Sequence, residues 1–144
     1  FPSTEPRVVR RLIRHLSDKI EDNVNYISRY KLHRLDDAEF VLISYGSSAR
    51  AALQFVENAR EKGTRVGLLE LQTLWPFPHA LVRDVCKDAA LVLVVEMNLG
   101  QIQEQVKIAV DRPDRVFLAN RIDEELITPQ DIENMMRLLR GRGM

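Results

Sequence analysis

Residues 40–52 have the sequence Phe-Val-Leu-Ile-Ser-Tyr-Gly-Ser-Ser-Ala-Arg-Ala-Ala and predict the first strand and helix of the fold. The four apolar residues that open this stretch are typical of a parallel strand covered by helices on both faces. Gly46 permits a sharp turn, and a helical pattern then runs from Ala49 to Lys62, where Gly63 is expected to end it. Ser47 or Ser48 can cap this helix by accepting from its free N–H groups, and the same N–H groups could receive an anion.

The chain that follows repeats the strand-then-helix pattern. Further strands are expected at Val66–Leu71, Ala90–Glu96 and Arg115–Ala119, with helices at His79–Lys87, at Ile102–Val110 and from Pro129, which Thr128 and Asp131 cap. The most hydrophobic strand, Ala90–Glu96, should be central. A short edge strand is expected at Arg29–Leu35, either antiparallel to the strand at residue 40 or not adjacent to it. The pattern predicts a three-layer α/β/α domain around a five-stranded, mostly parallel sheet.

A long helix precedes the sheet. Apolar residues recur at helical spacing from Arg7 to Ile27 and predict one amphipathic helix of about six turns, with Thr4 as its cap and Pro6 in its first turn. Its charged face is either simply solvated or, from Arg7 to Arg14, a basic docking patch. The expected organisation is a leading connector helix (1–28), an α/β domain (29–140) and a flexible tail (141–144).

The amino-acid composition limits the classes of protein to which this chain can belong. The 144 residues include 21 Lys and Arg and 21 Asp and Glu, so the net charge gives no indication of a nucleic-acid partner. No apolar stretch is long enough to span a membrane. One cysteine, Cys86, cannot form an internal disulfide or hold an iron–sulfur cluster, and it is expected to be a small buried hydrophobe. A reducing, cytoplasmic compartment is expected. The chain begins at Phe1, which indicates a fragment or a processed product.

Chemistry in such a sheet is expected where the carboxyl ends of the strands meet the helices. The residues placed at that edge are Tyr45, Gly46, Ser47, Thr73, Trp75, Glu96, Asn98 and Gln101. A dinucleotide fingerprint would need more glycines than Gly46, and a serine nucleophile would need a second glycine and a placed base. Glu96 is expected to brace a neighbouring turn rather than to act as an acid or base. Trp75 and Phe77 either plug the end of the sheet or form a contact surface.

Three segments resemble a known family. They are Tyr45–Ala52, Arg65–Pro78 with the string Thr-Leu-Trp-Pro-Phe-Pro, and Val94–Gln101 with the string Glu-Met-Asn-Leu-Gly-Gln. In this order they closely resemble the C-terminal part of the alpha subunit of 2-oxoacid:ferredoxin oxidoreductases, especially the 2-oxoglutarate type. The lead-in also fits, from Phe1 to Leu12 and from Lys19 to Asn23, whereas the chain after Val110 matches loosely.

The resemblance implies a fold like the transketolase C-terminal domain, a mixed five-stranded sheet with an antiparallel first strand. It implies a parent enzyme that oxidatively decarboxylates a 2-oxoacid to an acyl-CoA with thiamine diphosphate, magnesium and iron–sulfur clusters. Those cofactors lie in other domains of the family, so this chain is expected to bind none, to hold no catalytic residue and to be inactive alone.

The resemblance also implies the partners of such a domain. They are the pyrimidine-binding domain of the same subunit, the beta subunit, a second copy of the chain and, through the whole complex, ferredoxin, with no nucleic acid or membrane. The sheet-edge residues are expected to form the contact edge. The alternative is a stand-alone α/β domain that binds a small molecule in a polar pocket at that edge.

Overall fold

The computed structural model describes residues 5–123 and 125–141 of the chain. Thr4, the expected cap of the first helix, and residues 142–144 of the expected tail lie outside the described residues. Gly141, assigned to that tail, instead ends the last helix. Among the described residues, no helix has the length and apolar character needed to cross a membrane.

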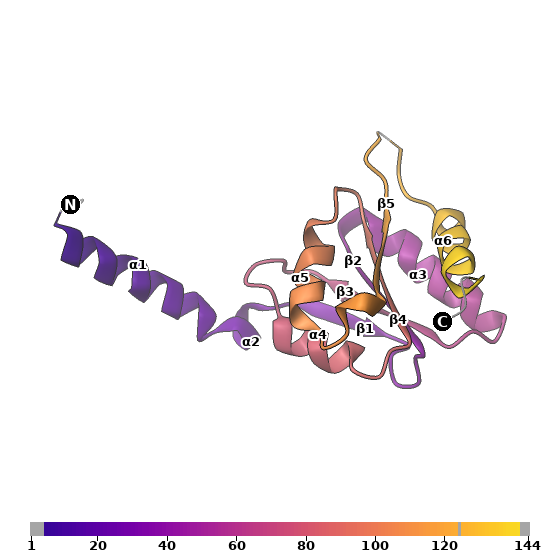
Figure 1. The fold of residues 1–144 in the computed structure, drawn as a ribbon, viewed down its shortest axis with the longest axis horizontal. Coiled ribbons are helices and arrows are strands. Elements are labelled where there is room, and N and C mark those ends of the chain that lie inside the picture. The colour runs from indigo at the N-terminus through magenta and orange to yellow at the C-terminus, as the bar shows by residue number, and fades with distance from the viewer. Residues whose placement is uncertain (1–4, 124, 142–144) are drawn as a thin grey trace.

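The leading segment forms two helices rather than the single one expected. The first, α1 (Pro6–Glu21), has Pro6 in its first turn as predicted, but its N-cap is Glu5; the second, α2 (Val24–Ile27), is one turn long. The break lies at Asn23, whose side-chain amide donates to the Lys19 carbonyl at 2.8 Å. Asparagine often interrupts a helix in this way because its side chain competes for backbone partners. Helix α1 stands away from the body of the molecule and buries none of its residues (Figure 1).

Five strands form one mixed sheet in the order β1-β3-β2-β4-β5. They are β1 (Tyr30–His33), β2 (Phe40–Tyr45), β3 (Val66–Leu71), β4 (Leu91–Glu96) and β5 (Val116–Asn120). Strand β1 pairs with β3 antiparallel and the other neighbours are parallel, which confirms the mostly parallel sheet with an antiparallel first strand at its edge. Strand β3 separates β1 from β2, so the non-adjacent alternative is correct. The middle strand is β2 rather than β4.

Helices cover both faces of the sheet and complete the three layers (Figure 1). On one face α3 (Gly46–Glu61) and α6 (Pro129–Gly141) pack together, and on the other α4 (His79–Cys86) packs with α5 (Gln101–Ala109). Each face has its own apolar core, because successive residues of each buried strand point to opposite sides. The predicted α/β/α architecture is therefore confirmed.

Two helix ends follow the sequence signals and one does not. Thr128 and Asp131 form a reciprocal capping box, in which the Thr128 N–H donates to Asp131 at 2.8 Å and the Asp131 N–H donates to Thr128 at 3.2 Å. Gly63 ends the turn after α3 with a positive φ of 81°. Helix α3, however, begins at Gly46, and neither Ser47 nor Ser48 caps it, because both lie inside the helix.

The apolar loop after β3 divides its two aromatic residues between core and solvent. Phe77 is buried beneath α4, whereas Trp75 is 72% exposed. The Trp75–Pro76 peptide bond is cis. Phe77 therefore takes the buried alternative, whereas Trp75 lies exposed at the surface. Cys86 is buried, as expected, and burial raises the pKa of its thiol to about 12.

Candidate functional site

A buried carboxylate organises the end of β4. Glu96 is completely buried, and its two oxygens accept the backbone N–H groups of Ile102 at 3.1 Å and Gln103 at 3.0 Å. These are free N–H groups in the first turn of α5, where the helix dipole also favours a negative charge. Glu96 therefore caps the N-terminus of α5 from inside the fold. This confirms the expectation that it braces a neighbouring turn.

Asn98 fixes the turn between β4 and α5. Its side-chain oxygen accepts the N–H groups of Gly100 at 2.8 Å and Gln101 at 3.0 Å, and its amide nitrogen donates to the hydroxyl of Tyr45. Asn120, at the end of β5, donates to the Asn98 carbonyl at 2.8 Å. The ends of β2, β4 and β5 are thus joined through one asparagine.

Tyr45 links this turn to the buried carboxylate. Its hydroxyl lies 3.5 Å from Glu96 Oε2 and also receives the bond from Asn98. Burial of the ring raises the pKa of the Tyr45 phenol, and the negative charge of Glu96 raises it further. The phenol therefore keeps its proton to a higher pH than an unperturbed tyrosine does.

This raised pKa predicts a loss of stability in alkali. The unfolded chain releases the phenol proton near pH 10.0, its usual pKa, while the folded protein still holds it. Above that pH the native state binds more protons than the unfolded state, so the free energy of unfolding falls as pH rises. Well below that pH both states keep the proton, so this group gives the free energy of unfolding no pH dependence. In urea titrations between about pH 9 and 11, Tyr45→Phe should show a flatter fall than the wild type. Tyr26→Phe, at an exposed position, should keep the wild-type slope, and equal slopes for all three proteins would contradict the assignment.

The remaining five predicted residues divide between different places in the fold. Gly46 makes the expected sharp turn with a φ of 58°, and Ser47 is exposed, with its hydroxyl 3.6 Å from the sulfur of Met97. Gln101 contributes its backbone N–H to Asn98, and its side chain is exposed. The structure thus places these three around the end of β2 and β4.

Thr73 lies at a different junction of the fold. Its hydroxyl accepts the Arg29 N–H at 3.1 Å, and its own N–H donates to the Arg29 carbonyl, so it ties the end of β3 to the start of β1. Trp75, two residues later, projects into solvent. Of the eight predicted residues, the structure joins Tyr45, Glu96, Asn98 and Gln101 by hydrogen bonds.

This arrangement is suited to holding the edge of the sheet rigid. The oxygens of Glu96 already accept two backbone N–H groups, and its carboxylate lies below the surface. A general base needs an open approach to the proton that it removes. Within residues 5–123 and 125–141, no three His, Cys, Asp or Glu side chains gather in a way that could hold a metal ion.

Arg60 is a structural residue that the sequence does not reveal. From α3 its guanidinium donates to the carbonyl oxygens of Val66 at 2.7 Å and Arg34 at 2.6 Å, and it pairs with Asp37 at 2.7 Å. It therefore holds the loop between β1 and β2 against the sheet. An arginine in the last turn of a helix is ordinarily a solvated charge, and no local signal distinguishes this one.

Comparison with known proteins places the sequence in one group. The family described as pyruvate:ferredoxin oxidoreductase core domain II matches residues 38–132. The chain is 37% identical over 133 residues to 2-oxoglutarate synthase subunit KorA of Methanocaldococcus jannaschii, covering 92% of this chain and 36% of that protein. It is 40% identical over 115 residues to ketoisovalerate oxidoreductase subunit VorB of Methanothermobacter marburgensis, covering 80% of this chain and 32% of that protein. The chain thus spans about a third of the length of these relatives.

Solved structures show the same fold. A 2-oxoglutarate:ferredoxin oxidoreductase from Magnetococcus marinus, solved with 2-oxoglutarate, coenzyme A and succinyl-CoA bound, superposes with a TM-score of 0.83 at 18% identity, over 95% of this chain and 24% of that chain. A split-gene transketolase superposes with a TM-score of 0.61 at 14% identity, over 76% of this chain and 40% of that chain. The expectation of a transketolase-like fold is confirmed.

Proposed function

The chain belongs to the pyruvate:ferredoxin oxidoreductase core domain II family, and on that premise we propose that it is the non-catalytic assembly domain of the alpha subunit of a 2-oxoacid:ferredoxin oxidoreductase. The parent enzyme would oxidatively decarboxylate a 2-oxoacid to an acyl-CoA and pass the electrons to ferredoxin. Its preferred substrate in this proposal is 2-oxoglutarate, because the match to a 2-oxoglutarate synthase subunit extends over 92% of the chain.

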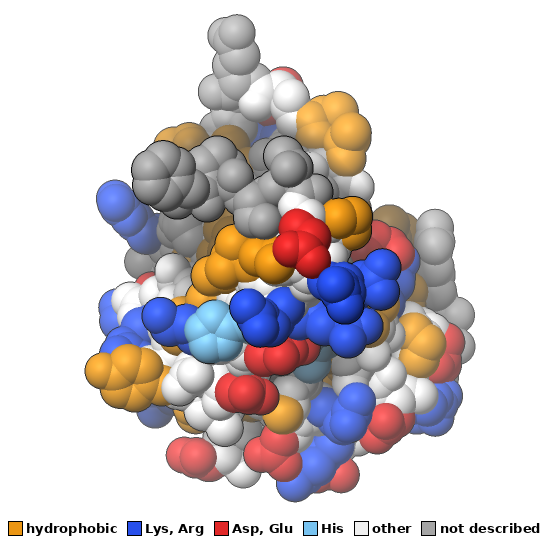
Figure 2. All heavy atoms as spheres, turned by 90° about the vertical axis from the view of Figure 1, so that its left-hand side faces the viewer, with side chains coloured by type: hydrophobic (Ala, Val, Ile, Leu, Met, Phe, Trp, Pro, Cys, Tyr) orange, Lys and Arg blue, Asp and Glu red, His pale blue; other side chains and the backbone are white. Residues whose placement is uncertain are grey.

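The observation that carries this proposal is the exposed apolar stripe of α1. Leu12, Ile13 and Leu16 are each more than half exposed, at 55%, 61% and 54%. In proteins most of the stability of a helix comes from packing its amphipathic face, and exposed apolar patches mark protein interfaces. Figure 2 views the side from which α1 projects and shows hydrophobic side chains beside Lys and Arg. Trp75, in the loop after β3, is also an exposed apolar side chain.

The partners in this proposal are protein surfaces of the parent complex. They are the pyrimidine-binding domain of the same subunit, the beta subunit and a second copy of the chain, with ferredoxin reached through the whole assembly. A cytoplasmic location is part of the same proposal, since the one cysteine of the chain is a buried free thiol.

The residues of this chain do not fit the cofactors of such an enzyme. An iron–sulfur cluster needs several cysteine thiolates, and the chain has only Cys86. The buried acid at the sheet edge, Glu96, already accepts two N–H groups and faces α5 rather than solvent. Thiamine diphosphate, magnesium and the clusters are therefore assigned to other parts of the parent complex, and no catalytic step is assigned to this chain.

The proposal is tested by assembling the enzyme. The gene that encodes this chain, whatever its full length, would be expressed with the gene of the beta subunit of the proposed complex. The purified complex would be assayed for CoA-dependent reduction of ferredoxin with 2-oxoglutarate, 2-oxoisovalerate and pyruvate. Highest activity with 2-oxoglutarate is expected. Highest activity with 2-oxoisovalerate would instead indicate that the parent enzyme prefers the substrate of the ketoisovalerate relative. A complex that contains thiamine diphosphate yet oxidises none of the three would contradict the proposal.

The exposed stripe gives a more local prediction. Leu16→Ser should leave the free energy of unfolding within about 0.5 kcal/mol of the wild type, because the side chain is more than half exposed. It should weaken copurification with the partner subunit, because an apolar anchor of the interface is lost. Asp18→Ser, on the polar side of the same helix, is the matched control and should copurify normally. Equal copurification of both variants would exclude the stripe from the interface.

The alternative of a stand-alone binding domain is tested by calorimetry on the purified chain. Thiamine diphosphate with magnesium, and then coenzyme A, should each give no saturable heat. Stoichiometric binding of either compound would show that the chain has a ligand site of its own for that compound. That outcome would contradict the assembly role.

A further inference from the structure

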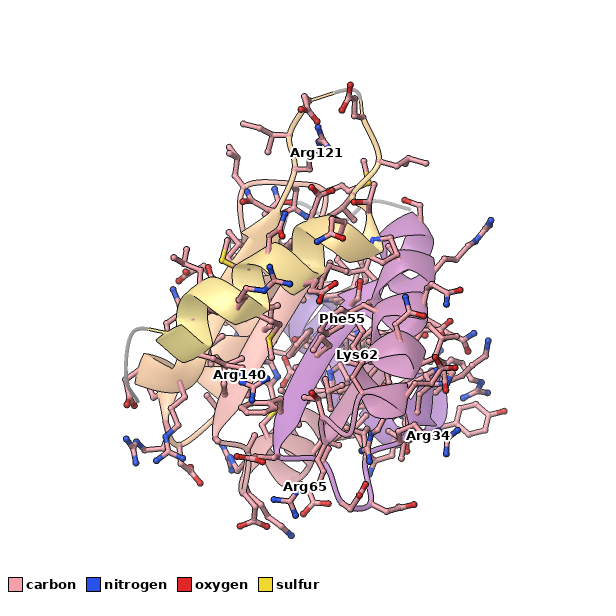
Figure 3. All side chains as sticks on the ribbon, turned by 90° about the vertical axis from the view of Figure 1, so that its right-hand side faces the viewer. Arg34, Phe55, Lys62, Arg65, Arg121 and Arg140 are labelled. Atoms are coloured by element: carbon pink, nitrogen blue, oxygen red, sulfur yellow. The ribbon has the colours of Figure 1, made fainter. Side chains whose placement is uncertain are left out.

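A groove between α3 and α6 has the shape of a small-molecule site. It has a volume of about 260 Å³. Its floor is apolar and consists of the buried side chains of Phe55, Ala59 and Met136. Figure 3 shows Phe55 and Lys62 on the α3 side of the groove and Arg140 on the α6 side. The groove is separate from the sheet edge described above, because it lies on the outer helical layer.

The rim of the groove is positively charged. Lys62, Arg137 and Arg140 line it, with Glu133 as the one acid among its lining residues. The carboxylate of Glu133 accepts from Lys62 at 3.3 Å and from Arg137 at 3.1 Å, and the hydrogen bond from Lys62 is the main reason that the pKa of this carboxyl lies below its usual range. One acid therefore balances one of three cations.

Arg140 is the cation best placed to receive a ligand. Its guanidinium lies over the Phe40 ring, 5.3 Å from the ring centroid. Among the described residues, no carboxylate lies within ion-pair distance of it. Arginine binds carboxylates through paired, charge-assisted hydrogen bonds. Arg140 lines the groove and also a second hollow that contains Phe40, on whose ring its guanidinium stacks.

We propose that this groove binds a small apolar carboxylic acid, with the carboxylate on Arg140 and the apolar part against Phe55 and Met136. A neutral apolar molecule would leave the arginine without an anion, and an inorganic anion would leave the apolar floor in water. At roughly 25–30 Å³ for each non-hydrogen atom, close to the share of one water molecule in the liquid, the volume holds about nine or ten atoms. Phenylacetate has this size. The inference does not depend on the proposed function.

The test is an NMR titration of the whole chain at fixed ionic strength. Sodium phenylacetate should shift the backbone amide signals of Ala59, Thr64 and Gln130 in a saturable manner, with a dissociation constant in the millimolar range or below. Acetate, which lacks the ring, and 2-phenylethanol, which lacks the charge, should each bind at least about fivefold more weakly. Equal affinity for phenylacetate and 2-phenylethanol, or no saturable shift with phenylacetate, would overturn the proposal.

Two variants distinguish binding in this groove from non-specific binding elsewhere on the chain. Arg140→Gln should weaken phenylacetate binding at least about fivefold, because it removes the anion partner. Glu133→Gln should tighten binding severalfold, because it releases Lys62 and Arg137 from their acid and removes a negative charge from the rim. Arg50→Gln, on the exposed face of α3 outside the groove, is the control and should bind as the wild type does. The same spectra report whether each variant is folded. If Arg140→Gln and Arg50→Gln bind equally, the groove is not the site.

Discussion

Replacement of Glu96 by alanine is expected to lower the free energy of unfolding by about 3 kcal/mol, a large part of the 5–15 kcal/mol typical of a domain. The variant leaves the N–H groups of Ile102 and Gln103 without their acceptors in a buried position. Each such group costs about 1–3 kcal/mol when it loses its partner. The loss of the charge at the N-terminus of α5 adds to this cost. Urea unfolding followed by circular dichroism measures the effect.

Glu104→Ala is the matched control for this prediction. Glu104 lies in the first turn of the same helix, but it is exposed and pairs with Lys107 at 3.0 Å. Exposed pairs of this kind contribute about 0.2–1 kcal/mol, so this variant should remain close to the wild type. If Glu96→Ala and Glu104→Ala lowered stability equally, the buried carboxylate would not be the brace of this edge.

Gly67→Ala is expected to destabilise the protein by about 3 kcal/mol, the upper part of the range for overpacking in a core. A Cβ at this position in β3 would lie 2.6 Å from the Arg34 carbonyl oxygen and 2.7 Å from Cδ2 of Leu35. The carbonyl cannot move away freely, because Arg60 donates to it at 2.6 Å. Arg34 itself has a positive φ of 54°, so the loop has little freedom to adjust. Thermal and urea unfolding measure the change.

Gly141→Ala provides the control for the added methyl group. Gly141 lies in the last turn of α6, and nothing lies within 4 Å of an added Cβ. Alanine favours helix over glycine by up to about 1 kcal/mol, so this variant should be neutral or slightly more stable. If the Gly67→Ala protein were as stable as Gly141→Ala, the loop between β1 and β2 would be able to make room for the methyl group without a loss of folding free energy.

The candidate site could be predicted only in part. The polar residues at strand ends were placed at one edge because parallel strands end on the same side, and the hydrogen bonds joining Tyr45, Glu96 and Asn98 follow from that placement. Thr73 lies elsewhere because β3 turns toward β1, where it pairs with Arg29. The groove lined by Arg140 could not be predicted, since its two walls come from residues 55–64 and 129–140 and meet only when α3 and α6 pack side by side.

The sequence by itself determined the order of strands and helices and several of their ends. Continuous apolar runs, helical spacing, the capping box at Thr128 and the left-handed turn at Gly63 act over a few residues, so they can be seen without a fold. Only the tertiary structure decided that β3 lies between β1 and β2, that Phe77 is buried while Trp75 is exposed, and that Arg60 holds a loop. These outcomes depend on contacts between segments far apart in the chain, whose energies no local pattern contains.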